Sequence, residues 1–223
     1  MGHLPYNLGL KTTYWIIVIC YLAVLATLFL KKSLKSKEMP SQKNLNRAIA
    51  IFFYMYVLAR IFFIFSDFER DPHGQTDLYF QFVAASYISN ILGFLVLIVV
   101  GEKYLIKPGK FLMSYILGAA LIINIIILIF FPALFTIARY FNYAIFYSEV
   151  AIVVLLFLYM IRNTPGKLRK NATYSLIGLI IMAVASFLES DALITQGIVQ
   201  PYYSPILFGV GATIFAYGQM KGL

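Results

Sequence analysis

The sequence predicts an all-α, polytopic membrane protein: a single domain over residues 1–223 in which seven transmembrane helices form one bundle. Of its 223 residues, 61% are hydrophobic and 12% are charged, which is about half the charged fraction of a soluble domain. Apolar runs long enough to cross a bilayer recur along the chain. The alternating pattern of a transmembrane β-barrel is absent, so helices are expected to satisfy the backbone hydrogen bonds within lipid.

Seven segments approach the ~20 residues that a helix needs to cross the hydrocarbon core. The predicted spans cover residues 14–30, 47–68, 79–100, 111–131, 134–161, 174–190 and 205–220. The first span is too long for a cleavable signal peptide, and its basic residues follow it. The longest connections are expected over residues 31–46 and 191–204, so we expect neither a soluble domain nor an attached catalytic domain.

Basic residues collect between alternate spans. One side is predicted to hold 14 of the 18 Lys and Arg residues: Lys31, Lys32, Lys35, Lys37, Lys43, Arg47, Lys103, Lys107, Lys110, Arg162, Lys167, Arg169, Lys170 and Lys221. The other side is predicted to hold Lys11 and Arg70 with the acidic residues Asp67, Glu69, Asp71, Asp77, Glu189 and Asp191. The positive-inside rule then places the N-terminus outside and the C-terminus inside. Because topology accounts for the net charge of +9, we expect no nucleic-acid partner.

Small residues in four spans predict close contacts between helix backbones. They are Ser86, Ser89, Asn90 and Gly93; Gly118, Ala119 and Ala120; Gly178, Ala185 and Ser186; and Gly209, Gly211, Ala212 and Gly218.

Arg60 stands inside an apolar run that ends in an acidic patch at Asp67, Glu69 and Asp71. A cation at the centre of a membrane helix costs about 2.5–3.5 kcal/mol on insertion scales, so it needs a partner, a wet cavity or a route to the interface. On a helix, Arg60 shares a face with Phe53, Tyr56, Phe63, Ile64 and Asp67.

The fifth span carries Arg139, Asn142, Phe146 and Glu149 on one face. Glu149 is predicted to lie deep in the bilayer, where an isolated carboxyl group takes up a proton or finds a cation. One alternative pairs it with Arg60, directly or through water or Asn90. The other lets Arg60 reach outward to Asp67, with Glu149 protonated or bonded to a tyrosine or an asparagine.

Arg139 is predicted about one turn from the outer surface. It would pair there with Asp67, Glu69, Glu189 or Asp191, or join Arg60 in presenting donors to an anionic ligand. The candidate ligand-binding residues are therefore Arg60, Asn90, Arg139, Asn142 and Glu149.

Enzymatic and cofactor chemistry is not expected. Both histidines, His3 and His73, lie outside the predicted spans, which argues against an intramembrane zinc site or a Ser–His or Cys–His pair. We expect neither a catalytic residue nor a bound metal, and the single cysteine, Cys20, forms no intrachain disulfide. The predicted spans lack lysine in their interiors, so no retinal is expected. Membrane lipids are the expected partners of the bundle. The basic 31–47 segment is interpreted as a determinant of topology, and binding of anionic lipid head groups is the alternative.

The last third of the chain holds four motifs in order: Lys167-Leu-Arg-Lys-Asn-Ala172, Leu176-Ile-Gly178, Glu189-Ser-Asp191 and Pro205-Ile-Leu-Phe-Gly209. With these motifs, residues 167–218 resemble the seven-transmembrane sensor module of some prokaryotic histidine kinases. The stretch from Arg60 to Asp71 is also similar to uncharacterised archaeal seven-helix membrane proteins. The resemblance implies a sensor that, without a kinase domain, signals through a separate protein or membrane subunit.

The sequence therefore favours a non-enzymatic, receptor-like sensor in a prokaryotic cell membrane, with its ligand inside the bundle. The alternative is a small secondary transporter, coupled to protons through Glu149. An assembly partner with no ligand of its own is a third hypothesis.

Overall fold

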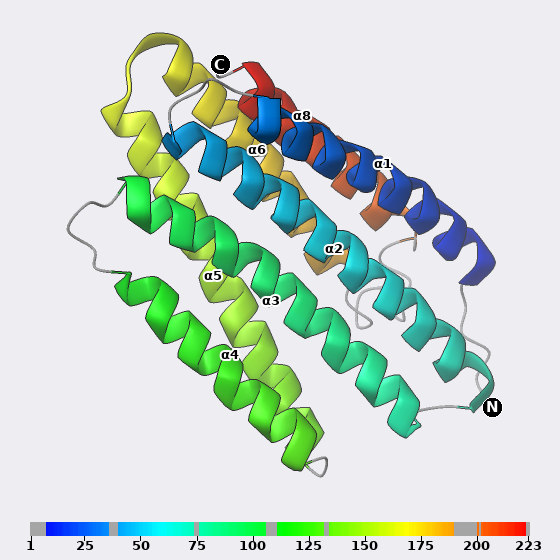
Figure 1. The fold of residues 1–223 in the computed structure, drawn as a ribbon. Coiled ribbons are helices and arrows are strands. Elements are labelled where there is room, and N and C mark those ends of the chain that lie inside the picture. Colours follow the sequence, from blue (N-terminus) through cyan, green and yellow to red (C-terminus); the bar gives the residue numbers. More distant parts are fainter. Residues whose placement is uncertain are drawn as a thin grey trace. The chain divides into compact units, whose positions relative to one another are not determined.

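The computed structural model describes residues 8–35, 40–73, 76–105, 111–131, 134–189, 200 and 202–221. These residues form helices α1 (Leu8–Lys35), α2 (Pro40–His73), α3 (Asp77–Leu105), α4 (Leu112–Phe130), α5 (Phe135–Asn163), α6 (Gly166–Leu188) and α8 (Tyr203–Lys221) (Figure 1). The prediction of an all-α fold is confirmed for the described residues.

Each predicted span lies in one of these helices, but most of the helices extend beyond the apolar segment. The connection expected over residues 31–46 is wrong, because α1 continues to Lys35 and α2 begins at Pro40. Likewise, α6 begins at Gly166, so the basic residues expected in a loop occupy its first turns. Hydropathy marks the part of a helix that fits the hydrocarbon core, whereas hydrogen bonding continues into the polar interface. Residue 190, at the end of the sixth span, lies outside the described residues.

Five helices are long and apolar enough to cross a membrane: α1, α2, α3, α5 and α6. Within the described part of the chain, α4 is a shorter apolar helix, and α8 is not among the five. Each of these two has 19 residues, about 28 Å of helix against a hydrocarbon core of about 30 Å. The structure therefore has the pattern of a multi-pass membrane protein.

The chain divides into two compact units. Unit 1 combines the residues up to Leu22 with those from Val154 onward, and unit 2 runs from Ala23 to Val153. In unit 1, α6 and α8 pack as an antiparallel pair. Ser204 Oγ donates to the Ala185 carbonyl oxygen at 2.8 Å near one end of the pair, and Gln219 Nε2 donates to Ser175 Oγ at 2.9 Å near the other.

Glycines allow the α6 and α8 backbones to touch. A Cβ atom on Gly178 would lie 2.3 Å from the Phe215 nitrogen, and one on Gly211 would lie 2.8 Å from the Gly178 carbonyl oxygen. The predicted small-residue contact is confirmed for this pair. It is wrong for Gly118 of α4, whose added Cβ would meet nothing within 4 Å.

An ion pair connects α1 and α6 in unit 1. Lys11 Nζ lies 3.9 Å from Glu189 Oε1, and both side chains are largely buried. The charge pattern assigned these two residues to the same side of the membrane, and the structure places them together.

In unit 2, α2 and α3 form an antiparallel pair (Figure 1). Aromatic side chains join the two helices. Phe63 meets Tyr87 with ring centroids 5.6 Å apart, and Phe52 meets Phe94 at 4.9 Å. Gly93 faces the same partner, because its added Cβ would lie 3.2 Å from Met55 Cβ. The predicted role of Gly93 in helix contact is confirmed.

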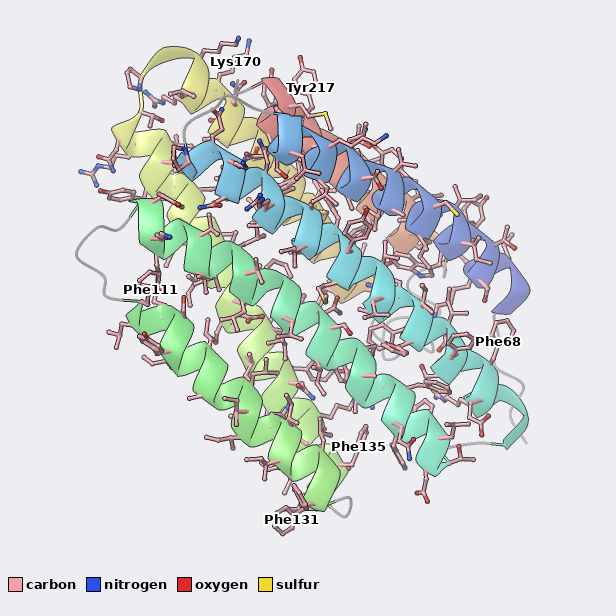
Figure 2. The ribbon with its side chains drawn as sticks, in the orientation of Figure 1. Phe68, Phe111, Phe131, Phe135, Lys170 and Tyr217 are labelled. Atoms are coloured by element: carbon pink, nitrogen blue, oxygen red, sulfur yellow. The ribbon has the colours of Figure 1, made fainter. Side chains whose placement is uncertain are left out.

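The N-terminus of α4 is capped by a residue of α3. Glu102 Oε1 accepts from the Met113 amide at 2.8 Å, and Oε2 accepts from the Ser114 amide at 3.0 Å and from the Ser114 hydroxyl. A carboxylate there satisfies amides that have no partner within the helix and complements the helix dipole. Sequence reasoning missed Glu102, which follows the third apolar span by two residues. Figure 2 shows Phe111 and Phe131 at the two ends of α4, with Phe135 at the start of α5 beside Phe131.

We predict that Gly178→Ala destabilises the protein, because its methyl group meets backbone atoms that cannot move aside. Overpacking of this kind costs about 1–3 kcal/mol. Thermal unfolding in detergent measures the effect, with Gly118→Ala as the matched control that adds the same methyl group in open space. Equal midpoints for the two variants would contradict the close packing of α6 on α8.

We also predict that Glu102→Ala loosens α4, because the buried donors at its N-terminus lose their acceptor at a cost of about 1–3 kcal/mol each. Glu102→Gln keeps one acceptor oxygen and should lose less. Hydrogen exchange of the first turn of α4 reports the change. Unaltered protection in Glu102→Ala would show that the carboxylate does not hold this end.

Candidate functional site

Four of the five candidate residues lie on α3 and α5 of unit 2, and Arg60 lies on α2. Three aromatic pairs run down the contact between α3 and α5 in the same direction on both helices: Phe80–Phe135, Tyr87–Tyr143 and Phe94–Phe146, with ring centroids 4.4, 5.6 and 5.5 Å apart. The α3 members recur every seven residues and so occupy one face of the helix. The three pairs define successive levels at which the polar side chains can be placed.

Arg60 of α2 is 4% exposed and contacts aromatic rings of its own helix. Its Nη2 donates to the Tyr56 hydroxyl. The guanidinium carbon lies 4.9 Å from the centre of the Tyr56 ring and 5.4 Å from that of Phe63. The predicted face is thereby confirmed for Tyr56 and Phe63. A desolvated cation over an aromatic ring gains about 2 kcal/mol, which offsets much of the cost of burying the charge.

Arg139 of α5 joins two tyrosines at the second level. Its Nε donates to the Tyr143 hydroxyl at 3.1 Å, and the Tyr87 hydroxyl donates to the same oxygen at 3.0 Å. Sequence reasoning missed Tyr143, although it follows Arg139 by four residues and so lies on the same helix face. The expected pairing of Arg139 with an acidic side chain stays a prediction, and Asp191 lies outside the described residues.

Asn142 is buried and bonds across to α4. The side-chain amide of Asn124, 0% exposed, donates to Asn142 Oδ1. Asn124 Oδ1 and Asn142 Nδ2 have no hydrogen-bond partner. Sequence reasoning also missed Asn124, whose signal was visible as the one asparagine in the fourth span.

Glu149 occupies the middle of α5, 14 residues from both Phe135 and Asn163, or about 21 Å from either end. Its side chain is 0% exposed, and neither carboxyl oxygen has a hydrogen-bond partner among the residues that the structure describes. The direct pair with Arg60, one of the two alternatives left open by the sequence, is therefore not formed. A buried polar group without a partner costs about 1–3 kcal/mol, and a charged one costs more.

The Phe94–Phe146 pair separates Glu149 from the other candidates. Glu149 follows Phe146 by one helical turn, whereas Asn90 precedes Phe94 by one turn on the parallel helix α3. Asn90 is buried, and its Oδ1 also lacks a hydrogen-bond partner. The five candidate residues therefore do not share one level of the helices. Glu149 lies on one side of the Phe94–Phe146 pair, and the other four lie on the opposite side.

Comparison of the chain with protein-family models, curated proteins and solved structures gave no match. The resemblance to sensor modules therefore stays a prediction. Among the described residues, no group of three or more His, Cys, Asp or Glu side chains is placed to hold a metal ion.

We predict that Glu149→Met raises the stability of the protein in detergent, because it removes two partnerless oxygens and keeps an unbranched side chain. The expected gain is about 1–3 kcal/mol. Asn142→Leu is the matched control on the same face of α5. It should lose stability, since the Asn124 amide loses its acceptor. A lower unfolding midpoint for Glu149→Met would show that the carboxyl group supports the fold.

Proposed function

We propose that the protein is a non-enzymatic membrane sensor or receptor-like module, with seven spans, its N-terminus outside and its C-terminus inside a prokaryotic cell membrane. It binds a ligand within unit 2 and signals through a separate protein. The observation that carries this proposal is the Glu149 carboxyl group, wholly buried at mid-helix with both oxygens unpartnered.

Lipid supplies no hydrogen bonds, so ionisable groups within membrane helices are rare and mark functional sites. Neighbouring helices satisfy other polar groups in unit 2: Glu102 holds two amides and a hydroxyl, and Asn124 holds Asn142. Neither oxygen of Glu149 is satisfied by a described residue, and a ligand that donates to them would restore the stability lost by burying the carboxyl group. The carboxyl group lies on α5, which aromatic contacts hold against α3. Binding of a ligand to Glu149 can therefore change how α5 packs.

Proton-coupled transport is the second candidate, and the same carboxyl group favours it. Transport requires that Glu149 face each side of the membrane in turn, whereas sensing requires only a change of conformation. Reconstituted vesicles with a pH-sensitive dye inside separate the two. The sensor proposal expects no proton uptake that depends on Glu149, and uptake lost in Glu149→Gln would favour the transporter.

We test signalling by hydrogen exchange of the intact protein in lipid nanodiscs. Glutamine neutralises residue 149 as a bound ligand would, so Glu149→Gln should alter exchange beyond α5, including at the ends of α6 and α8. Glu69→Gln is the matched control, because it makes the same change in unit 2 at the end of α2. A change confined to the turns beside residue 149 would contradict a signalling role.

A further inference from the structure

We infer that Glu149 is a cation-binding group whose ligand is a small monovalent cation, the proton included, admitted past the Phe94–Phe146 pair. This inference rests on the proposed function and deepens it, since it names the ligand class of the same site. Nothing else in the described part of unit 2 combines full burial, a negative charge and the absence of any partner.

The sign of the ligand's charge follows from the Glu149 carboxyl group, whose oxygens are acceptors. Glu149 contributes two acceptor oxygens, and Asn90 contributes a third one turn beyond the aromatic pair. Acceptors are satisfied by donors or by cations, and an unpaired carboxylate in an apolar medium takes a proton or a positive ion. An anionic ligand would place like charges together in a medium that screens them weakly.

The neighbouring titratable groups in unit 2 do not serve as partners of the Glu149 carboxyl group. On α2, Phe52 contacts Phe94 and Phe63 contacts Tyr87, so Arg60 lies between these two levels and nearer that of Tyr87. The guanidinium of Arg60 lies over the rings of Tyr56 and Phe63. Tyr87 and Tyr143 bond to each other, and Tyr143 also accepts from Arg139. Tyr147, two residues before Glu149 on α5, is exposed, and Glu102 caps α4.

The size of the ligand follows from the aromatic packing beside the carboxyl group. Phe146 meets Phe94 edge to face, and Phe94 meets Phe52 of α2 in the same way at 4.9 Å. Three rings from three helices thus pack at the level next to Glu149. A ring rotation can admit a proton or a bare ion, and ring faces stabilise a passing cation, whereas a large organic ligand would require the helices to separate.

Dicyclohexylcarbodiimide tests this inference, because this apolar reagent modifies membrane carboxyl groups only in their protonated form. The intact protein in nanodiscs is treated across a series of pH values, and mass spectrometry of peptides locates the adduct. We expect Glu149 to be labelled at acid pH and several-fold less at alkaline pH. Labelling that does not vary with pH would show a permanently neutral carboxyl group and overturn the inference.

Salts identify the cation. Sodium or potassium chloride that suppresses labelling at constant pH, where choline chloride does not, would assign the metal ion. Labelling that depends on pH and not on salt would assign the proton.

A substitution at Phe146 tests whether the cation passes the Phe94–Phe146 pair. Phe146→Ala should raise the labelling rate several-fold, whereas Phe80→Ala, which opens the first aromatic pair of the same contact, should leave it unchanged. Equal rates in the two variants would remove the Phe94–Phe146 pair from the path. Exchange that propagates to α6 and α8 in Glu149→Gln, combined with labelling insensitive to pH, would leave the proposed sensor standing and overturn only the cation.

Discussion

Lipid cannot donate or accept a hydrogen bond, and this constraint organises the polar side chains of the helices. Several polar side chains of unit 2 find a protein partner. Arg60 bonds to Tyr56, Arg139 bonds to Tyr143, and Asn124 bonds to Asn142. Glu149, by contrast, lies at the centre of α5 and has no hydrogen-bond partner for either carboxyl oxygen among the described residues.

Close packing of the helices gives the unsatisfied carboxyl group of Glu149 its significance. Glycines bring α6 and α8 into backbone contact in unit 1, and aromatic pairs join α3 to α2 and to α5 in unit 2. Helices held in this way have little freedom to bring a partner to a buried carboxyl group. A group that lowers the stability of such a scaffold is expected where function requires it, and the proposed site follows from that contrast.

Part of the site could be predicted because polar residues are conspicuous in apolar segments. Arg60 and Glu149 stood out for this reason, and helical periodicity placed Asn142 and Glu149 on the buried face that the structure shows. Their partners could not be predicted in the same way. Tyr143, Asn124 and Glu102 were missed, because a sequence does not show which helices and helix ends meet.

Composition and hydropathy determined that this chain is helical and suited to a membrane, since lipid imposes the same demand on each crossing segment. They also located each described helix, though not its ends, because charged turns continue beyond the hydrocarbon core. Tertiary structure decided which polar groups are satisfied. Arg60 and Glu149 both have the charge to pair, but the levels of the helices keep them on opposite sides of Phe94 and Phe146. Register and packing between helices fix that separation, and the hydrophobic periodicity of a single helix predicts neither of them.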